Sequence, residues 1–182
     1  MKRFVKWLTI AIPLLFAVFV GGAYVLPADV NVRRAVTIEA PPDKVFPYLN
    51  DLKAFTTWSP WSTYDPKTVV TYDGPVQGVG QTMTWSSDNP NVGKGTQTIV
   101  ESDPDKRVVS NLDFGDMGKA KAFFDLAPEG QGTKVTWGLD TTMNSPFERW
   151  LGLWLDNAIG SEYDRGLKRL KALVETGAVP QN

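Results

Sequence analysis

Apolar residues run without interruption near the N-terminus of the chain. Trp7 to Leu26 is a stretch of about 20 residues without a charged side chain, which is long enough to cross the hydrocarbon core of a membrane. Lys2, Arg3 and Lys6 precede it, and basic residues before a membrane segment favour a cytoplasmic N-terminus. We therefore expect residues 1–29 to be a transmembrane anchor or signal segment, with the following domain periplasmic or extracytoplasmic.

Cleavage of this segment is a separate question. Gly21 and Ala23 form a passable small-residue cleavage site, but the apolar run is longer than that of an ordinary signal peptide. We favour an uncleaved anchor. A cleaved signal would leave the same domain in the same compartment.

After Pro27 the pattern changes to short alternating segments. Val32 to Glu39 alternates with a period of two, which predicts a strand, and Pro41-Pro42 ends it. Val45, Phe46 and Leu49 give one short helical face, and a second short helix is expected over residues 52–57. Six further strands are expected at Lys67–Tyr72, Gln81–Ser86, Gly95–Glu101, Arg107–Phe114, Lys119–Leu126 and Thr133–Thr142.

The turns between these strands are rich in Gly, Pro, Asn and Asp, as in Asp103-Pro104-Asp105 and Pro128-Glu129-Gly130. Short connections between successive strands imply an antiparallel meander, and one face of such a sheet must be covered by another element.

The last apolar segment predicts the element that covers the sheet. Ser145-Pro146-Phe147-Glu148 is a capping box with proline at the first helical position, and the helix can continue to Thr176 before Gly177. About 30 residues at 1.5 Å each give roughly 45 Å, enough to span a sheet. The expected fold class is therefore α+β.

The apolar residues of this helix fall into two stripes. Leu155, Ile159, Tyr163, Leu167, Leu170 and Val174 form the stripe that we assign to the core. Phe147, Trp150, Leu151, Trp154 and Ala158 form another stripe, turned away from it, which should face something beyond the sheet. Gly152, Gly160 and Gly166 each disfavour a helix interior by about 1 kcal/mol, so they are expected to mark a bend or close packing.

Composition narrows the possible chemistry. The 182 residues include no histidine and no cysteine, which excludes histidine general bases, cysteine nucleophiles and the metal sites that these residues build. We expect no metal and no cofactor. The net charge is −1, with basic residues scattered along the chain, so a nucleic-acid partner is not expected. One domain is expected over residues 30–177, followed by a tail at 178–182.

The order of these elements resembles the START-like (SRPBCC) superfamily, in its polyketide cyclase/dehydrase branch. The resemblance is carried by Val36-Thr37-Ile38-x-Ala40-Pro41, Trp58-Ser59-Pro60-Trp61, Tyr72-x-Gly74-x-x-x-Gly78-x-Gly80, Thr133-x-Val135-x-Trp137 and Gly166-Leu167-x-x-Leu170. It implies a helix-grip fold, in which a curved antiparallel sheet of about seven strands wraps around the long C-terminal helix, with two short helices after the first strand. It also implies a cavity for lipids or other hydrophobic molecules, and no common catalytic residue.

The candidate ligand-binding residues are mostly aromatic, because indole rings offer both apolar surface and an N–H donor. They are Trp58, Trp61, Trp85, Trp137, Phe147, Trp150, Leu151 and Trp154. In the resembled fold they are expected to converge near the cavity. Simple core packing is the better interpretation for Trp58, Trp61 and Trp137, whereas Trp150 and Trp154 are the better functional candidates.

Three functions are compatible with this pattern. The leading hypothesis is a membrane-tethered module that binds or transfers a hydrophobic small molecule or lipid, with the first half of the last helix as a gate. The first alternative is a cyclase- or dehydratase-type enzyme that works without histidine, which requires a buried carboxylate or tyrosine with a shifted pKa at the cavity. The second is a module that docks a membrane or a protein through Phe147, Trp150, Leu153 and Trp154.

Overall fold

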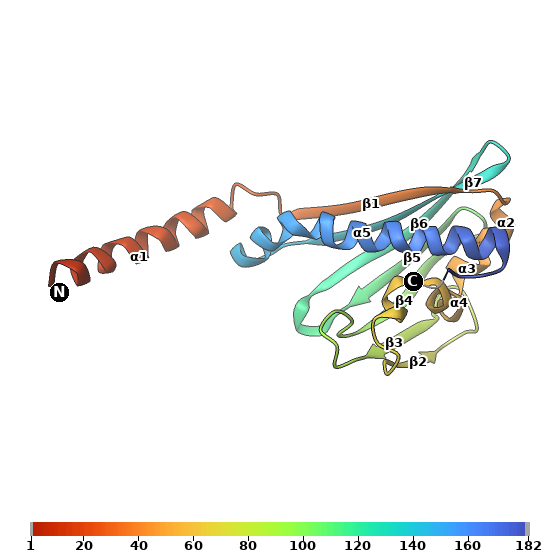
Figure 1. The fold of residues 1–182 in the computed structure, drawn as a ribbon, viewed down its shortest axis with the longest axis horizontal. Helices are drawn as coiled ribbons and strands as arrows, with labels where there is room; N and C mark the ends of the chain where they lie inside the picture. Colours follow the sequence, from red (N-terminus) through yellow and green to blue (C-terminus); the bar gives the residue numbers. More distant parts are fainter. Residues whose placement is uncertain (1, 181–182) are drawn as a thin grey trace.

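A seven-stranded antiparallel sheet and one long helix make up most of the molecule (Figure 1). The computed structural model describes residues 2–180, and within the first helix it describes the side chains of Trp7 and of residues 11 onward. The helices are α1 (Lys2–Ala23), α2 (Pro42–Val45), α3 (Pro47–Asn50), α4 (Leu52–Trp58) and α5 (Pro146–Thr176), and 3-10 turns η1 (Pro60–Thr63) and η2 (Gly115–Met117) complete them. The strands are β1 (Asp29–Ile38), β2 (Val69–Asp73), β3 (Thr82–Ser86), β4 (Lys94–Asp103), β5 (Arg107–Asp113), β6 (Lys119–Glu129) and β7 (Gly132–Thr142).

The strand order β1-β7-β6-β5-β4-β3-β2 confirms the predicted meander, with β1 added beside β7. Every neighbouring pair is antiparallel, as the short Gly- and Pro-containing connections require. The register shifts once, between Ile99 and Glu101, where a bulge in β4 increases the local bend of the strand. The curved sheet and the long C-terminal helix together confirm the helix-grip fold.

The two faces of the sheet differ because successive residues of a strand point to opposite sides. The inner face, which carries α5, includes Val135, Trp137 and Leu139 of β7, all buried. The outer face carries the residues between them and is largely polar. Phe123 is the main exception, and the guanidinium groups of Arg33 and Arg107 cover its ring at 4.4 and 4.8 Å.

Short helices cover the inner face at the end of the sheet where α5 finishes (Figure 1). The first of the two predicted short helices is divided into α2 and α3, because Pro47 begins a new helix. Asp51 caps α4 by accepting a hydrogen bond from the Lys53 amide. Leu49, Leu52 and Trp58 are buried and join the core beneath α5.

The bounds of α5 match the prediction at both ends. Ser145 and Glu148 form the capping box, with the Ser145 hydroxyl accepting from the Glu148 amide at 3.2 Å. At the other end Gly177 takes the left-handed conformation, with φ 76°, that commonly ends a helix. Tyr163, Leu167 and Leu170 are buried, which confirms the core stripe in its second half.

Helix α1 projects away from the sheet, and its last turns pack against the start of α5 (Figure 1). Among the described residues, no helix combines the length and apolar character needed to cross a membrane. The anchor over residues 1–29 stays a prediction, and the basic side chains of Lys2, Arg3 and Lys6 lie outside the described part. The predicted tail is described as far as Pro180, and residues 181–182 lie outside the described range.

Candidate functional site

Burial divides α5 into a closed half and an open half. In its second half Gly160, Tyr163, Gly166, Leu167, Arg169 and Leu170 are buried. In its first half Phe147, Leu151, Leu153 and Trp154 are 64, 50, 52 and 72% exposed. The sheet therefore holds one half of the helix tightly and leaves the other accessible.

Stacked aromatic rings fill the closed half. The Trp137 ring lies 3.9 Å from the Tyr163 ring, with an interplanar angle of 9°. Trp58 and Trp61 meet Trp137 edge-on, with ring centroids 5.3 and 5.8 Å away. Trp58 is fully buried, and its indole N–H donates to the Tyr48 carbonyl. The core interpretation is confirmed for Trp58 and Trp137, and Trp61 packs against the same cluster while half-buried.

Tyr163 is buried within the aromatic core. Burial raises the pKa of its phenol far above the ordinary value, because the phenolate would lose its hydration. The stacked Trp137 ring shares the buried environment. Tyr163 is therefore a structural residue of the closed half.

A polar clamp fastens η1 to the closed half of α5. The Tyr64 hydroxyl donates to Glu162 at 2.8 Å, and Arg165 donates both to Glu162 at 2.7 Å and to the Pro60 carbonyl at 3.0 Å. The hydrogen bond to Glu162 is the main cause that raises the pKa of Tyr64. The bonds of Tyr64 and of the Pro60 carbonyl therefore join η1 and the residue after it to the closed half of the helix.

Arg34 marks the middle of α5, where the closed half ends. It lies on the inner side of β1 and reaches two carboxylates of the helix, Asp156 at 3.0 Å and Asp164 at 3.4 Å. The guanidinium passes directly over Gly160, where a Cβ would collide with it. Gly160 is therefore a close-packing glycine, which confirms that part of the sequence prediction. The hydrogen bond from Arg34 is the main cause that lowers the pKa of Asp156.

Beyond Arg34 the inner face of the sheet becomes accessible. Leu112, Ala120 and Thr141 form one row across β5, β6 and β7, and all three are only half-buried. Ser110, Ala122 and Leu139, in the next row toward the closed half, are buried. On α5 the helix residues Leu155 and Ile159 are also half-buried. We call the half-buried set Leu112, Ala120, Thr141, Leu155 and Ile159 the inner-face surface.

A polar pair lies at the edge of this apolar surface. The Gln97 side-chain amide donates to the Ser110 hydroxyl at 3.2 Å, and both residues are buried. Gln97 pairs with Leu112 across the strands, so it belongs to the same inner row. The pair offers hydrogen-bonding groups beside apolar contacts, as ligand sites commonly do. Sequence reasoning missed it, although the inward position of Gln97 follows from its alternation with Ile99.

The predicted aromatic residues do not converge at one place. Trp85 lies at the far end of the inner face, over Gly95 and edge-on to Phe114 at 5.9 Å, and its N–H donates to the Val92 carbonyl. Trp150 turns away from the sheet and stacks on Phe19 of α1. Phe147, Leu151 and Trp154 are exposed to solvent. The expectation of convergence is wrong, because the eight residues divide among the core, the far end of the sheet and the start of α5. Their role in ligand binding stays a prediction.

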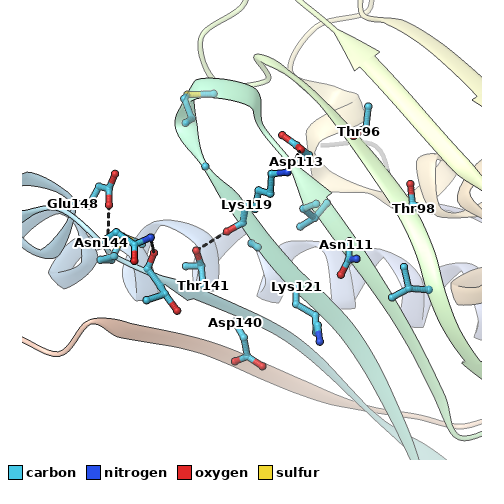
Figure 2. Close-up of a pocket in the computed structure, with 17 residues that line it drawn as sticks. Thr96, Thr98, Asn111, Asp113, Lys119, Lys121, Asp140, Thr141, Asn144 and Glu148 are labelled. Atoms are coloured by element: carbon cyan, nitrogen blue, oxygen red, sulfur yellow. Dashed lines mark hydrogen bonds and ion pairs between the residues drawn. The ribbon is translucent and has the colours of Figure 1, made fainter.

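A pocket of about 920 Å³ lies on the outer face of the sheet and reaches the first turn of α5 at Glu148 (Figure 2). Its floor carries Thr98, Asn111, Lys121 and Asp140, one from each of four adjacent strands. The Lys119 ammonium forms an ion pair with Asp113 at 2.9 Å, which lowers the pKa of this carboxyl. The lining combines the charged and polar side chains of a solvated sheet face with the apolar residues Val100, Leu112, Met117, Ala120 and Met143.

Acidic groups do not gather at the inner-face surface. The buried polar residues of the described chain include no carboxylate. The carboxylates with lowered pKa are surface groups that accept hydrogen bonds from cations, from amides or, for Asp65, chiefly from the Ser87 hydroxyl. Within the same described residues there is no cluster of three acidic groups able to hold a metal ion.

The chain is similar to several solved structures, each at an identity that establishes the fold alone. The di-domain ARO/CYC StfQ from the steffimycin biosynthetic pathway gives a TM-score of 0.61 at 12% identity, with 81% of this chain and 51% of that chain covered. The Aha1 dimer from Colwellia psychrerythraea gives 0.53 at 20% identity, covering 81% and 98%. Protein CV1439 from Chromobacterium violaceum gives 0.54 at 22% identity, covering 80% and 96%. No curated protein matches the chain.

The sequence also matches a family model described as "Polyketide cyclase / dehydrase and lipid transport" over residues 29–175. This range begins at the first residue of β1 and ends one residue before the end of α5. The match therefore includes all seven strands, the short helices and the long helix. The chain belongs to the polyketide cyclase/dehydrase and lipid transport family.

Proposed function

We propose that this protein binds a hydrophobic small molecule or lipid against the inner-face surface, between the sheet and the first half of α5. The observation that carries the proposal is the change in burial along the two facing elements. Ser110, Ala122 and Leu139 are buried, whereas the next row is only half-buried. Apolar surface that a protein keeps accessible on two facing elements favours an apolar occupant, because contact with it removes that surface from water.

The polar groups at the site suit a ligand with one polar end. Gln97 and Ser110 can orient such a group while Leu112 and Ala120 contact an apolar body. The family, whose description includes lipid transport, supports this class of ligand. We assign the first half of α5 as the gate, because Arg34 holds the helix at its middle and the apolar residues of the first half are more exposed than those of the second.

The proposal includes attachment to a membrane through residues 1–29, with the domain on the extracytoplasmic side. Its support is the uncharged run from Trp7 to Leu26 and the preceding basic residues. A tether raises the effective concentration of membrane-derived ligands at the site. The tether and the site are separate claims and can fail separately.

Native mass spectrometry of the full chain, released from detergent micelles after purification from its host, tests the site. We expect a lipid or other apolar adduct on the wild-type protein. Ala120→Trp should remove the adduct, because the indole would fill the inner-face surface from the middle of its row. Ala127→Trp is the matched control, since Ala127 lies exposed on the outer face of the same strand. Absence of any adduct from the wild type, or equal retention in the two variants, would contradict the proposed site.

The cyclase or dehydratase alternative lacks the feature that it requires. It requires a buried carboxylate or tyrosine with a shifted pKa at the cavity. The carboxylates with shifted pKa lie at the surface. As far as the described residues show, Tyr163 is enclosed within the aromatic core, and Tyr64 is bonded to Glu162 beside η1. Binding is therefore the function that the geometry supports best.

A further inference from the structure

The opening turns of α5 expose a concentrated apolar patch. Phe147, Leu151, Leu153 and Trp154 leave half or more of their surface in solvent, and Trp154 leaves 72%. We call these four residues the collar. Large apolar side chains that are exposed together on the opening turns of one helix commonly mark a site that another surface covers.

Two residues between those of the collar, Arg149 and Trp150, contact helix α1 and the turn after it. The Trp150 ring stacks on the Phe19 ring at 5.8 Å, and its indole N–H donates to the Phe19 carbonyl at 3.1 Å. Arg149 also spans the junction, lying over the Tyr24 ring at 5.2 Å and donating to the Leu26 carbonyl at 3.4 Å. These contacts fix the start of α5 against the end of α1. Any external surface that binds α1 therefore also lies close to the collar.

The exposed side chains of α1 indicate which kind of external surface binds it. Those that the structure describes are uncharged and mostly apolar, including Ile12, Leu14, Leu15, Phe16 and Val18, each more than 60% exposed. Together with Trp154 and Phe147 they form the mixture of aliphatic and aromatic groups that enters the boundary between lipid headgroups and acyl chains.

The acidic residues beside the collar are occupied by other parts of the protein. The Glu148 carboxylate accepts from the amides of Asn144 and Ser145, at 2.7 and 3.0 Å, and these bonds lower its pKa. Asp156 is paired with Arg34. Both carboxylates are therefore turned to partners within the domain, and the collar itself presents only apolar groups.

We infer that the collar is seated in the interface of a phospholipid bilayer, beside the segment that tethers the chain. This inference rests on the membrane attachment in the proposed function and adds a second contact, made by the domain itself. Leu151, Leu155 and Ile159 follow one another at intervals of four residues, so they share a side of α5. They form a continuous apolar path from the collar to the inner-face surface, along which a ligand passes between lipid and site without entering bulk water.

The absence of cysteine from the chain permits a direct test. Leu153→Cys in the full chain is labelled with the environment-sensitive fluorophore NBD and reconstituted into vesicles of phosphatidylcholine with a minor share of phosphatidylglycerol. Val69→Cys is the control, because Val69 is similarly apolar and exposed but lies on β2, at the far edge of the sheet. Flotation of the vesicles in a density gradient reports attachment of the chain, and doxyl-labelled lipids report contact of the fluorophore with acyl chains.

We expect the chain to float with the vesicles, the emission of the Leu153 label to shift to shorter wavelength, and doxyl lipids to quench it. The Val69 label should show neither change. Flotation without quenching at Leu153 overturns the inference and leaves the tether intact. Absence of flotation refutes the tether and the inference together, but not the ligand site. Energy transfer between differently labelled copies, without doxyl quenching, would assign the collar to a second copy and also overturn the inference.

Discussion

Two glycines of α5 provide a paired test of how the helix is held. Gly160 and Gly166 both lie in the helix interior and both are buried. Alanine at either position gains about 1 kcal/mol of helix propensity relative to glycine. The gain in helix propensity is the same at both positions. A difference in unfolding free energy between Gly160→Ala and Gly166→Ala therefore reflects how tightly the residues around each new methyl group are packed.

The surroundings predict different outcomes. At Gly166 a Cβ would lie 2.7 Å from Cζ3 of Trp137 and 3.0 Å from Cδ of Pro60, and both rings are held in the packed core. Overpacking of this kind costs about 1–3 kcal/mol, so Gly166→Ala should be destabilised by about 0–2 kcal/mol net. At Gly160 the obstacle is the guanidinium at the flexible end of Arg34. Moving it sacrifices partly exposed ion pairs worth about 1 kcal/mol or less, and the net change should be near zero.

Urea unfolding of the full chain in a mild detergent, followed by tryptophan emission, measures the difference. We expect the midpoint for Gly166→Ala to fall below that for Gly160→Ala with little change in slope, since the surface exposed on unfolding is the same. Equal midpoints would refute the close packing of Gly166 as an energetic constraint. A lower midpoint for Gly160→Ala would show that Arg34 contributes more than exposed ion pairs ordinarily do.

Two further predictions concern acidic residues of α5. Arg34→Gln should raise the pKa of Asp156 toward its ordinary value, as measured by NMR titration, and an unchanged pKa in the variant would contradict the pairing. In the wild type, the stability that the pairing contributes is present above the ordinary pKa of Asp156. It is lost as the pH falls through the lowered pKa. Ser145→Ala should reduce the free energy of unfolding by about 1 kcal/mol because the cap is lost. The Ser145→Ala variant should keep the low pKa of Glu148, because the backbone amide of residue 145 contributes most to lowering it and is still present. A return of this pKa to the ordinary value would contradict that role of the amide.

The fold was predictable because its signals are local. The strand bounds follow from turns such as Asp103-Pro104-Asp105, which lies between the end of β4 at Asp103 and the start of β5 at Arg107. The ends of α5 follow from Ser145 and Gly177, whose side chain and backbone freedom act within one turn of the helix. Element order then restricted the topology to a meander covered by one helix.

The candidate site was less predictable because it depends on register. Alternation placed Arg34 on the apolar side of β1, but its partners Asp156 and Asp164 are set by how α5 lies across that strand. The same applies to Gln97 and Ser110, which meet across β4 and β5. The amphipathic pattern shows which residues point inward, but it does not show where the helix and the sheet separate. For the same reason, the pattern did not predict that the aromatic residues lie in separate parts of the fold.

The open half of α5 was partly foreseen. The apolar residues around its opening turns indicated a surface beyond the sheet, and the structure exposes Phe147 and Trp154 there. The contact of Trp150 with Phe19 was not foreseen, because it joins segments separated by 131 residues. Such contacts leave no mark in the local pattern of either segment.

The pairing of β1 with β7 has a consequence for how the chain is made. Asp29 pairs with Thr142, 113 positions later, so the first strand has no partner in the sheet until nearly the whole domain has left the ribosome. Closing so large a loop is entropically costly and makes folding slow relative to chains dominated by neighbouring contacts. β1 is an edge strand of the finished sheet, but translation products that end before β7 would leave both of its sides unpaired and would also open the edge of β6. Open edges promote intermolecular strand pairing. Completion of the last strand and of α5 is therefore the step that protects the nascent domain from aggregation.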